Sequence, residues 1–181
     1  MDDRSELIVG RRLVGIGVLV SGVILSGCGG GTSPEEWAEA VCSSGADWAD
    51  ALQSQADQLQ SRVDTATPEE AKQLLVDFLD GTVDETEELL ADIEAAGEPS
   101  ADRGEAFAAD VEDEFEESRD ALANARDEIE SLSVTDPATF SQKASELGSL
   151  LGQVLSNFDP PRNEEMEQAF EDVAACNDLG G

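Results

Sequence analysis

The feature that most restricts the fold is a helix-start pattern that occurs twice. Ser33–Pro34–Glu35–Glu36 and Thr67–Pro68–Glu69–Glu70 each combine a capping hydroxyl, a proline at the first helical position and a glutamate three residues after the cap. Such a capping box satisfies backbone N–H groups that have no partner in the first helical turn. Apolar residues then recur at helical spacing, which predicts two long helices, the first reaching Val63 and the second ending before Gly97. Their predicted core positions are Trp37, Val41, Trp48, Leu52, Leu59 and Val63, then Ala71, Leu75, Phe78, Leu89, Ile93 and Ala96.

The rest of the chain follows the same period, and no segment has a convincing strand pattern. A third helix is predicted from about Ala101 to Leu132, a fourth starts at Asp136–Pro137, and Asp159–Pro160–Pro161 ends it. The third and fourth stripes are Ala108, Val111, Phe115, Leu122, Ala125, Ile129 and Leu132, then Phe140, Ala144, Leu147, Leu151, Val154 and Phe158. A short fifth helix carries Met166, Phe170, Val173 and Cys176.

These segments predict an all-α domain over residues 34–181. Because short loops favour antiparallel neighbours, we expect an antiparallel up-down four-helix bundle. In that topology the fourth helix ends near the start of the first. The short fifth C-terminal helix then folds back across that end.

The charge of the chain restricts its partners. Acidic residues number 42 and basic residues 10, which gives a net charge of −32 at pH 7. A surface of this sign repels phosphate backbones and anionic lipids, so no nucleic-acid binding is expected. Two interpretations of the acidic residues stay open: a solvated surface, or a surface that gathers cations or a basic partner.

The first residues have the pattern of an export signal. Arg11–Arg12 precede an uncharged apolar run from Leu13 to Leu25. This run has the length of a signal-peptide core and is too short to span a bilayer comfortably. We therefore expect residues 1–27 to be a cleaved signal peptide that is absent from the mature fold.

The residues that follow, Leu25–Ser26–Gly27–Cys28, resemble the lipobox of bacterial lipoproteins. The resemblance implies cleavage between Gly27 and Cys28 and a thioether-linked diacylglyceryl group on Cys28. Two acyl chains anchor a protein stably where one does not. Residues 28–33 would then be the lipidated cysteine and a flexible glycine-rich tether that holds the domain on the extracytoplasmic face of the cell membrane. The alternative is an ordinary secretory signal with a coincidental cysteine.

The lipobox resemblance also bears on the other cysteines. With Cys28 lipidated, Cys42 and Cys176 remain as a pair in an oxidising compartment. We expect a disulfide between them that joins the first helix to the last. The alternative is two free buried thiols, and two cysteines without histidine offer too few soft ligands for a metal site.

Catalytic patterns are missing from the sequence. The chain has no His, which nucleophile–base catalysis usually requires. Lys143 lies near Ser141 and Ser145, but no oxyanion-hole pattern accompanies them. EF-hand spacing and a phosphate-binding glycine loop are absent too. We expect a protein that is not an enzyme and has no metal or cofactor.

Two other groups of residues are candidate binding features. The acidic stretches Asp84–Glu94 and Asp110–Asp120 are solvated helix faces or loose Ca²⁺ or Mg²⁺ sites. Trp37 and Trp48 lie about three helical turns apart on one face of the first helix. They are candidate ligand-groove residues or, alternatively, core anchors.

Residues 13–181 resemble a loose group of uncharacterised exported lipoproteins of high-GC Gram-positive bacteria. The resemblance is carried by "LSGC", "PEEWAEAVCSSGADW", "TPEEAKQLLVDFLDGTVDETEEL" and a C-terminal "AAC". It implies a membrane-anchored, non-enzymatic helical domain that serves as an interaction or envelope-associated module. The alternative function is a ligand- or cation-binding carrier.

Overall fold

The computed structural model describes residues 31–135, 137–156 and 162–178. The predicted signal peptide and Cys28 lie outside these residues. The described residues form helices and no strand, which confirms the all-α class. The helices are α1 (Pro34–Val63), α2 (Pro68–Ala96), α3 (Gly104–Ser131), α4 (Pro137–Ser156), α5 (Glu164–Asp172) and α6 (Ala174–Asp178).

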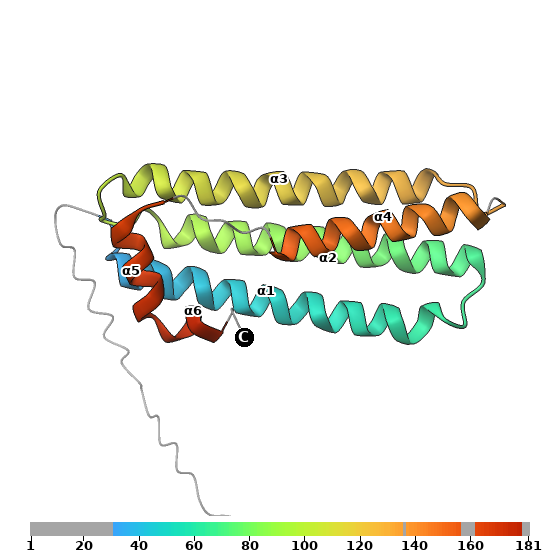
Figure 1. Cartoon of the computed structure of the whole chain (residues 1–181), viewed down its shortest axis with the longest axis horizontal. Helices are drawn as coiled ribbons and strands as arrows, with labels where there is room; N and C mark the ends of the chain where they lie inside the picture. The colour runs from blue at the N-terminus through green and yellow to red at the C-terminus, as the bar shows by residue number, and fades with distance from the viewer. Residues whose placement is uncertain (1–30, 136, 157–161, 179–181) are drawn as a thin grey trace, which may run out of the picture.

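The long helices lie side by side and reverse direction from one to the next (Figure 1). Helix α2 packs against α1 on one side and against α3 on the other, and α4 packs against α3. Helices α5 and α6 pack against α1 at the end where α1 begins. We call this the N-terminal end of the domain; the loop between α1 and α2 marks the opposite, far end.

Both predicted capping boxes are present. The Ser33 Oγ accepts a hydrogen bond from the Glu36 backbone N–H at 3.2 Å, and the Glu36 carboxylate accepts from the Ser33 N–H at 3.4 Å. Thr67 and Glu70 repeat this exchange at the start of α2. The backbone and side-chain hydrogen bonds that Thr67 donates lower the pKa of Glu70. Helices α1 and α2 therefore begin at the residues that local chemistry selects.

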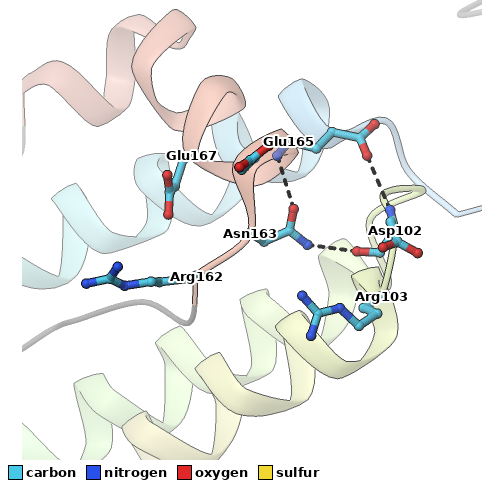
Figure 2. A pocket seen from close by; sticks show the side chains of 7 residues that line it. Asp102, Arg103, Arg162, Asn163, Glu165 and Glu167 are labelled. Atoms are coloured by element: carbon cyan, nitrogen blue, oxygen red, sulfur yellow. Dashed lines mark hydrogen bonds between the residues drawn. The ribbon is translucent and has the colours of Figure 1, made fainter.

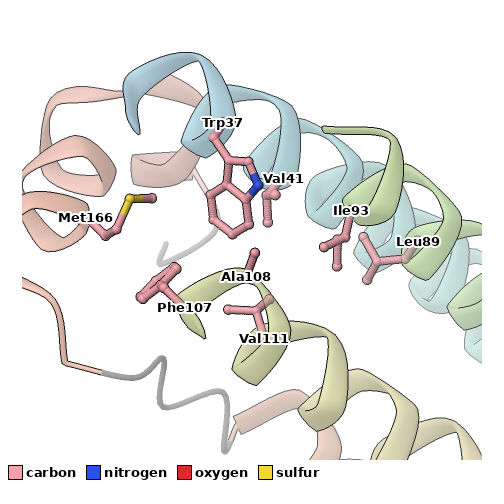
Figure 3. Packing of buried hydrophobic residues seen from close by; sticks show 8 residues of the cluster. All are labelled: Trp37, Val41, Leu89, Ile93, Phe107, Ala108, Val111 and Met166. Atoms are coloured by element: carbon pink, nitrogen blue, oxygen red, sulfur yellow. The ribbon is translucent and has the colours of Figure 1, made fainter. Parts of the chain in front are cut away.

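The core consists of two apolar clusters, one near each end. At the N-terminal end the buried residues are Trp37, Val41, Leu89, Ile93, Phe107, Ala108, Val111 and Met166 (Figure 3). Towards the far end they are Leu75, Val76, Phe78, Leu79, Leu122, Ile129 and Leu147.

Two buried threonines of α2 lie in the stretch of helix between these clusters. The Thr82 hydroxyl donates to the Phe78 carbonyl oxygen and the Thr86 hydroxyl to the Thr82 carbonyl oxygen, both at 2.8 Å. The Trp48 Nε1 donates to the Thr86 Oγ1 at 3.2 Å. The polar groups buried here are therefore hydrogen-bonded, as burial requires.

Helix α4 is attached to the far half of α3. Its buried Leu147 belongs to the far cluster, and Lys143 Nζ lies 2.6 Å from the Glu128 carboxylate and 2.7 Å from that of Glu146. Those carboxylates raise the pKa of Lys143. At the same end, Lys72 Nζ donates to the Leu132 carbonyl oxygen at 2.9 Å, which joins the start of α2 to the end of α3.

The structure corrects two helix boundaries. The single fifth helix was predicted through Cys176, but α5 ends at Asp172 and Val173 is extended (φ −88°, ψ 124°) before α6. The Asn177 side-chain amide donates to the Val173 carbonyl oxygen at 3.1 Å, which satisfies a carbonyl at this break. The third helix begins at Gly104 rather than near Ala101. The predicted core residue Phe158 lies outside the described residues.

Candidate functional site

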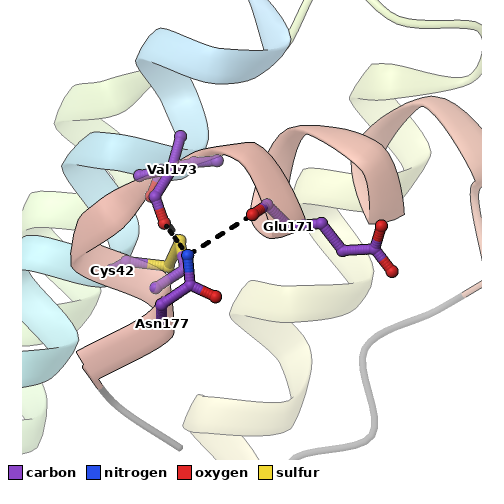
Figure 4. The surroundings of a disulfide bond; sticks show 6 residues. Cys42, Glu171, Val173 and Asn177 are labelled. Carbon is purple, nitrogen blue, oxygen red and sulfur yellow. Dashed lines mark hydrogen bonds between the residues drawn. A yellow bond between two sulfur atoms is a disulfide. The ribbon is translucent and has the colours of Figure 1, made fainter.

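The N-terminal end of the domain is closed by a disulfide. Cys42 on α1 and Cys176 on α6 are joined with an S–S distance of 2.03 Å and a Cα–Cα distance of 5.0 Å (Figure 4). The predicted pairing is confirmed. Cys42 is buried, with 4% of its surface exposed. The bond attaches α6 to the third turn of α1.

The chain that leads into α1 is attached to the loop between α2 and α3, residues 97–103. Thr32 Oγ1 donates to the Ala96 carbonyl oxygen at 2.9 Å, and the Ser100 N–H donates to the Thr32 carbonyl oxygen at 2.7 Å. Thr32 also forms an isolated parallel bridge with Pro99. We call these contacts the Thr32 clasp. They place Thr32 and Ser33, which the sequence assigned to the tether, within the folded domain.

Glycine is required where the clasp and α3 approach the loop. A Cβ added to Gly31 would overlap the Glu98 carbonyl oxygen, and one added to Gly104 would overlap the Pro99 carbonyl oxygen. Only a residue without a side chain lets the two backbones pass at this distance.

Trp37 lies beneath this loop as a core anchor. Its side chain has no exposed surface, and its Nε1 donates to the Gly97 carbonyl oxygen at 2.6 Å. Its ring meets Phe107 and Phe170 edge-on, with centroids 5.6 Å and 6.1 Å away. Figure 3 shows Phe107 and Met166 on one side of it and Val41 on the other.

The predicted ligand groove lined by Trp37 and Trp48 is therefore not formed at Trp37. Trp48 is half-buried, and its ring meets Phe115 edge-on at 6.0 Å while its N–H donates to Thr86. Both indoles are occupied by helix packing, which fits the core-anchor interpretation. The physical reason is that α3 and α5 close over the face of α1 on which a groove was expected.

A hollow of about 580 Å³ opens at the same end of the domain. Its lining comes from the α2–α3 loop and the start of α5: Asp102, Arg103, Arg162, Asn163, Glu164, Glu165 and Glu167 (Figure 2). We call it the Arg103–Arg162 hollow. The sequence did not predict it, because its two sides are some sixty residues apart and neither carries a recognisable motif.

Asn163 holds the two sides of this hollow together. Its Oδ1 accepts from the backbone N–H groups of Glu165 at 3.1 Å and Met166 at 3.3 Å, which caps α5. Its Nδ2 donates to the Asp102 carbonyl oxygen at 2.8 Å, and the Asp102 N–H donates to the Glu165 carboxylate at 3.2 Å. Asn163 is 9% exposed, so the floor of the hollow is a fixed frame.

The acidic faces lie on the outside of α2 and α3. Glu87 and Glu94 of α2 face Glu112 and Glu116 of α3 across a surface depression that also includes Arg119. Partial burial raises the pKa of Glu112, and Glu94, Glu116 and Asp113 add to this rise through charge repulsion. Among the described residues, no group of three or more acidic or cysteine side chains is arranged to hold a metal ion.

Comparison with known proteins identifies no relative of this chain. No protein-family model matches the chain, and neither a curated protein nor a solved structure is significantly similar to it. Within residues 31–135, 137–156 and 162–178, no helix is both long and apolar enough to cross a membrane.

Proposed function

We propose that this protein is an extracytoplasmic lipoprotein, anchored in the cell membrane through Cys28, whose helical domain is a non-enzymatic interaction or envelope-associated module. The single observation that carries the proposal is the Cys42–Cys176 disulfide. The bond accounts for two of the three cysteines in the sequence, and the third, Cys28, stands at the end of a lipobox-like sequence.

The disulfide supports an exported protein because such bonds form and persist in oxidising compartments and are rare in the cytosol. A cytosolic chain would keep Cys42 and Cys176 reduced. An exported one also requires a signal, which the apolar run Leu13–Leu25 supplies in sequence. Fold and sequence therefore support the same compartment by separate arguments.

The position of the clasp supports anchoring at this end. Only Gly29–Gly31 separate Cys28 from Thr32, so a flexible tether would reach about 11 Å. The N-terminal end of the domain, with its disulfide and the Arg103–Arg162 hollow, would then face the bilayer. The far end of an antiparallel four-helix bundle would be presented to partners.

The non-enzymatic part of the proposal is supported at Lys143, the lysine closest in sequence to two serines. A lysine that acts as a general base must lose its proton near neutral pH. Lys143 instead contacts two carboxylates, which hold its pKa above the ordinary value. It is a cross-link between α3 and α4.

The test compares the full-length wild type with a Cys28→Ala variant in a Gram-positive bacterial host. We expect the wild-type protein in the membrane fraction, with a mass that starts at a diacylglyceryl-modified Cys28. Cys28→Ala should lose the lipid and the processing at that site, while non-reducing electrophoresis still detects the Cys42–Cys176 bond. An unmodified thiol at Cys28, or a wild type that retains Met1 in the membrane fraction, would contradict the proposal.

A further inference from the structure

We infer that the Arg103–Arg162 hollow binds a zwitterionic phosphate ester. Its phosphate accepts hydrogen bonds from the guanidinium groups of Arg103 and Arg162, and its ammonium group contacts the carboxylates of Glu164 and Glu167. The inference goes beyond the proposed function and rests on four features of the hollow: free arginines, a fixed frame, mixed charge and size.

The first feature is that both arginines lack a partner in a strongly acidic protein. Arg119, Arg126 and Lys143 form ion pairs, and Lys72 donates to a backbone carbonyl oxygen. Within the part of the chain that the structure describes, Arg103 and Arg162 make no ion pair and no side-chain hydrogen bond, a property that they share with the exposed Arg62 at the far end. Their planar N–H forks are available to bind phosphate oxygens, which they match in geometry.

The second feature is the frame between the arginines. Arg162 directly precedes Asn163, and Arg103 directly follows Asp102, whose carbonyl oxygen Asn163 binds at 2.8 Å. Figure 2 shows Arg162 and Arg103 extending from the two sides of this contact. Because both arginines start from backbone positions that this contact holds, only their exposed side chains have to be ordered on binding.

The third feature is the mixture of charges, which selects the ligand class. The hollow is lined by two arginines and by four carboxylates, those of Asp102, Glu164, Glu165 and Glu167. The carboxylates would repel inorganic phosphate, and the arginines would repel a simple amine or a metal ion. A molecule with one phosphate and one ammonium group meets both kinds of side chain with the opposite charge. The Glu165 carboxylate already accepts from the Asp102 N–H, which leaves Glu164 and Glu167 for the ammonium.

The fourth feature is size. A volume of about 580 Å³ lies within the range of small-molecule sites, which is about 300–1,000 Å³. Phosphoethanolamine fits this description, and it has two sources. It occurs as a soluble monoester and, in diester form, as the headgroup of a membrane phospholipid. The second source lies next to the hollow only if the proposed anchor at Cys28 is correct.

Calorimetric titration of the purified full-length chain tests the inference. We expect saturable binding of phosphoethanolamine or glycerophosphoethanolamine, and weak or no binding of inorganic phosphate or ethanolamine alone. Tighter binding of the diester assigns the site to the lipid headgroup, and tighter binding of the monoester assigns it to the soluble compound. The ligands are soluble and their binding needs no anchor, so failure of the Cys28 proposal would not affect this result.

The variants are Arg162→Gln and Arg103→Asn, the latter because Asn tolerates the left-handed backbone at this residue (φ 57°). Each should weaken binding about tenfold or more, as expected for loss of a charge-assisted hydrogen bond of about 1.5–3 kcal/mol. Glu167→Gln should weaken binding of phosphoethanolamine, because it removes a carboxylate that contacts the ammonium group. Arg62→Gln is the matched control, because Arg62 is an exposed arginine at the far end.

Three results would overturn the inference. They are the absence of saturable binding to either ester, equal affinity for inorganic phosphate and phosphoethanolamine, and a loss in Arg62→Gln equal to that in Arg162→Gln. Circular dichroism of each variant separates loss of the site from loss of the fold.

Discussion

At the scale of single residues, Gly97 has the most restrictive backbone in the described chain. It ends α2 with φ 72° and ψ −152°, a combination that is essentially confined to glycine. Its carbonyl oxygen also accepts the Trp37 indole hydrogen bond. The conformation of one glycine therefore positions the acceptor for the largest buried side chain.

We predict that Gly97→Ala destabilises the domain by about 1–3 kcal/mol, because the added Cβ is strained in this region of φ and ψ. Urea unfolding followed by circular dichroism measures the change. Gly148→Ala is the control, since Gly148 lies within α4 with open space around it, and should stabilise the domain by about 0.5–1 kcal/mol. Equal effects at both positions would contradict the argument.

Glu112 is a second residue that has a specific effect on stability, through its pKa. Its pKa is raised in the folded protein by partial burial and by repulsion from Glu94, Glu116 and Asp113. A carboxyl group with a raised pKa favours the fold fully at pH values below its unfolded pKa, and loses that contribution as the pH rises through its folded pKa. The ionised form of Glu112 at neutral pH therefore destabilises the fold relative to the protonated form.

We expect Glu112→Gln to raise the Tm at pH 7, and the gain to disappear below about pH 4.5, where the wild-type group is protonated. Thermal unfolding at several pH values measures this. Glu117→Gln, an exposed position on the same helix, removes the same charge and is the control. A gain that is unchanged at low pH, or that Glu117→Gln reproduces in full, would show that the local repulsion is not the cause.

At the scale of helices, the disulfide joins the first and the last of the described helices. It joins residues 134 positions apart, and α5 also packs against α1 and, through Phe170 and Phe107, against the start of α3. Closing a loop of this length lowers the entropy of the unfolded chain. In the loop-closure model this raises the free energy of unfolding by up to about 5 kcal/mol.

We predict that a Cys42→Ala/Cys176→Ala variant loses about 2–5 kcal/mol of stability at neutral pH. Reduction of the wild type by a dithiol should lower the Tm to a similar extent. Unfolding of both forms, with and without reductant, provides the measurement. A variant as stable as the oxidised wild type would show that packing of Met166 and Phe170 holds the C-terminal helices without the bond.

The same helices show what a sequence reveals and what it does not. The starts of α1 and α2 were predictable because capping is local: hydroxyl, proline and glutamate lie within four residues. The break at Val173 was not, because the amide that satisfies its carbonyl belongs to Asn177, and a helical period runs through the break in sequence. The α5 cap was also missed, since Asn163 makes its second contact with a residue 61 positions away.

The tryptophans show the same limit at the candidate site. Spacing placed Trp37 and Trp48 on one face of α1, and that much is confirmed by their shared cluster. Whether the face stays open depends on how α3 and α5 pack over it, which no local pattern records. The Arg103–Arg162 hollow depends on such packing too, so it could be found only from the structure.

At the scale of the whole molecule, the dominant quantity is a net charge of −32. Most acidic side chains are exposed on the outer faces of the helices, and the described ion pairs neutralise only a few of them. Self-repulsion of this kind opposes a compact fold and is screened by salt.

We therefore predict that the Tm rises with ionic strength and with millimolar Ca²⁺. Going from about 0.01 M to about 0.1 M salt shortens the Debye length from about 30 Å to about 10 Å. Differential scanning calorimetry in NaCl, with a neutral osmolyte at matched osmolality as the control, measures the response. A melting curve that is indifferent to both salt and Ca²⁺ would contradict strong self-repulsion.

The Thr32 clasp has a mechanical consequence for an anchored protein. A pull from the membrane would enter the domain at residue 31, and the hydrogen bonds of Thr32 to Ala96 and Ser100 would bear it before the first turn of α1. Further along α1, the Cys42–Cys176 bond is a covalent link that such a pull cannot extend. Such a pull would thus be shared at the N-terminal end between α1, the α2–α3 loop and α6.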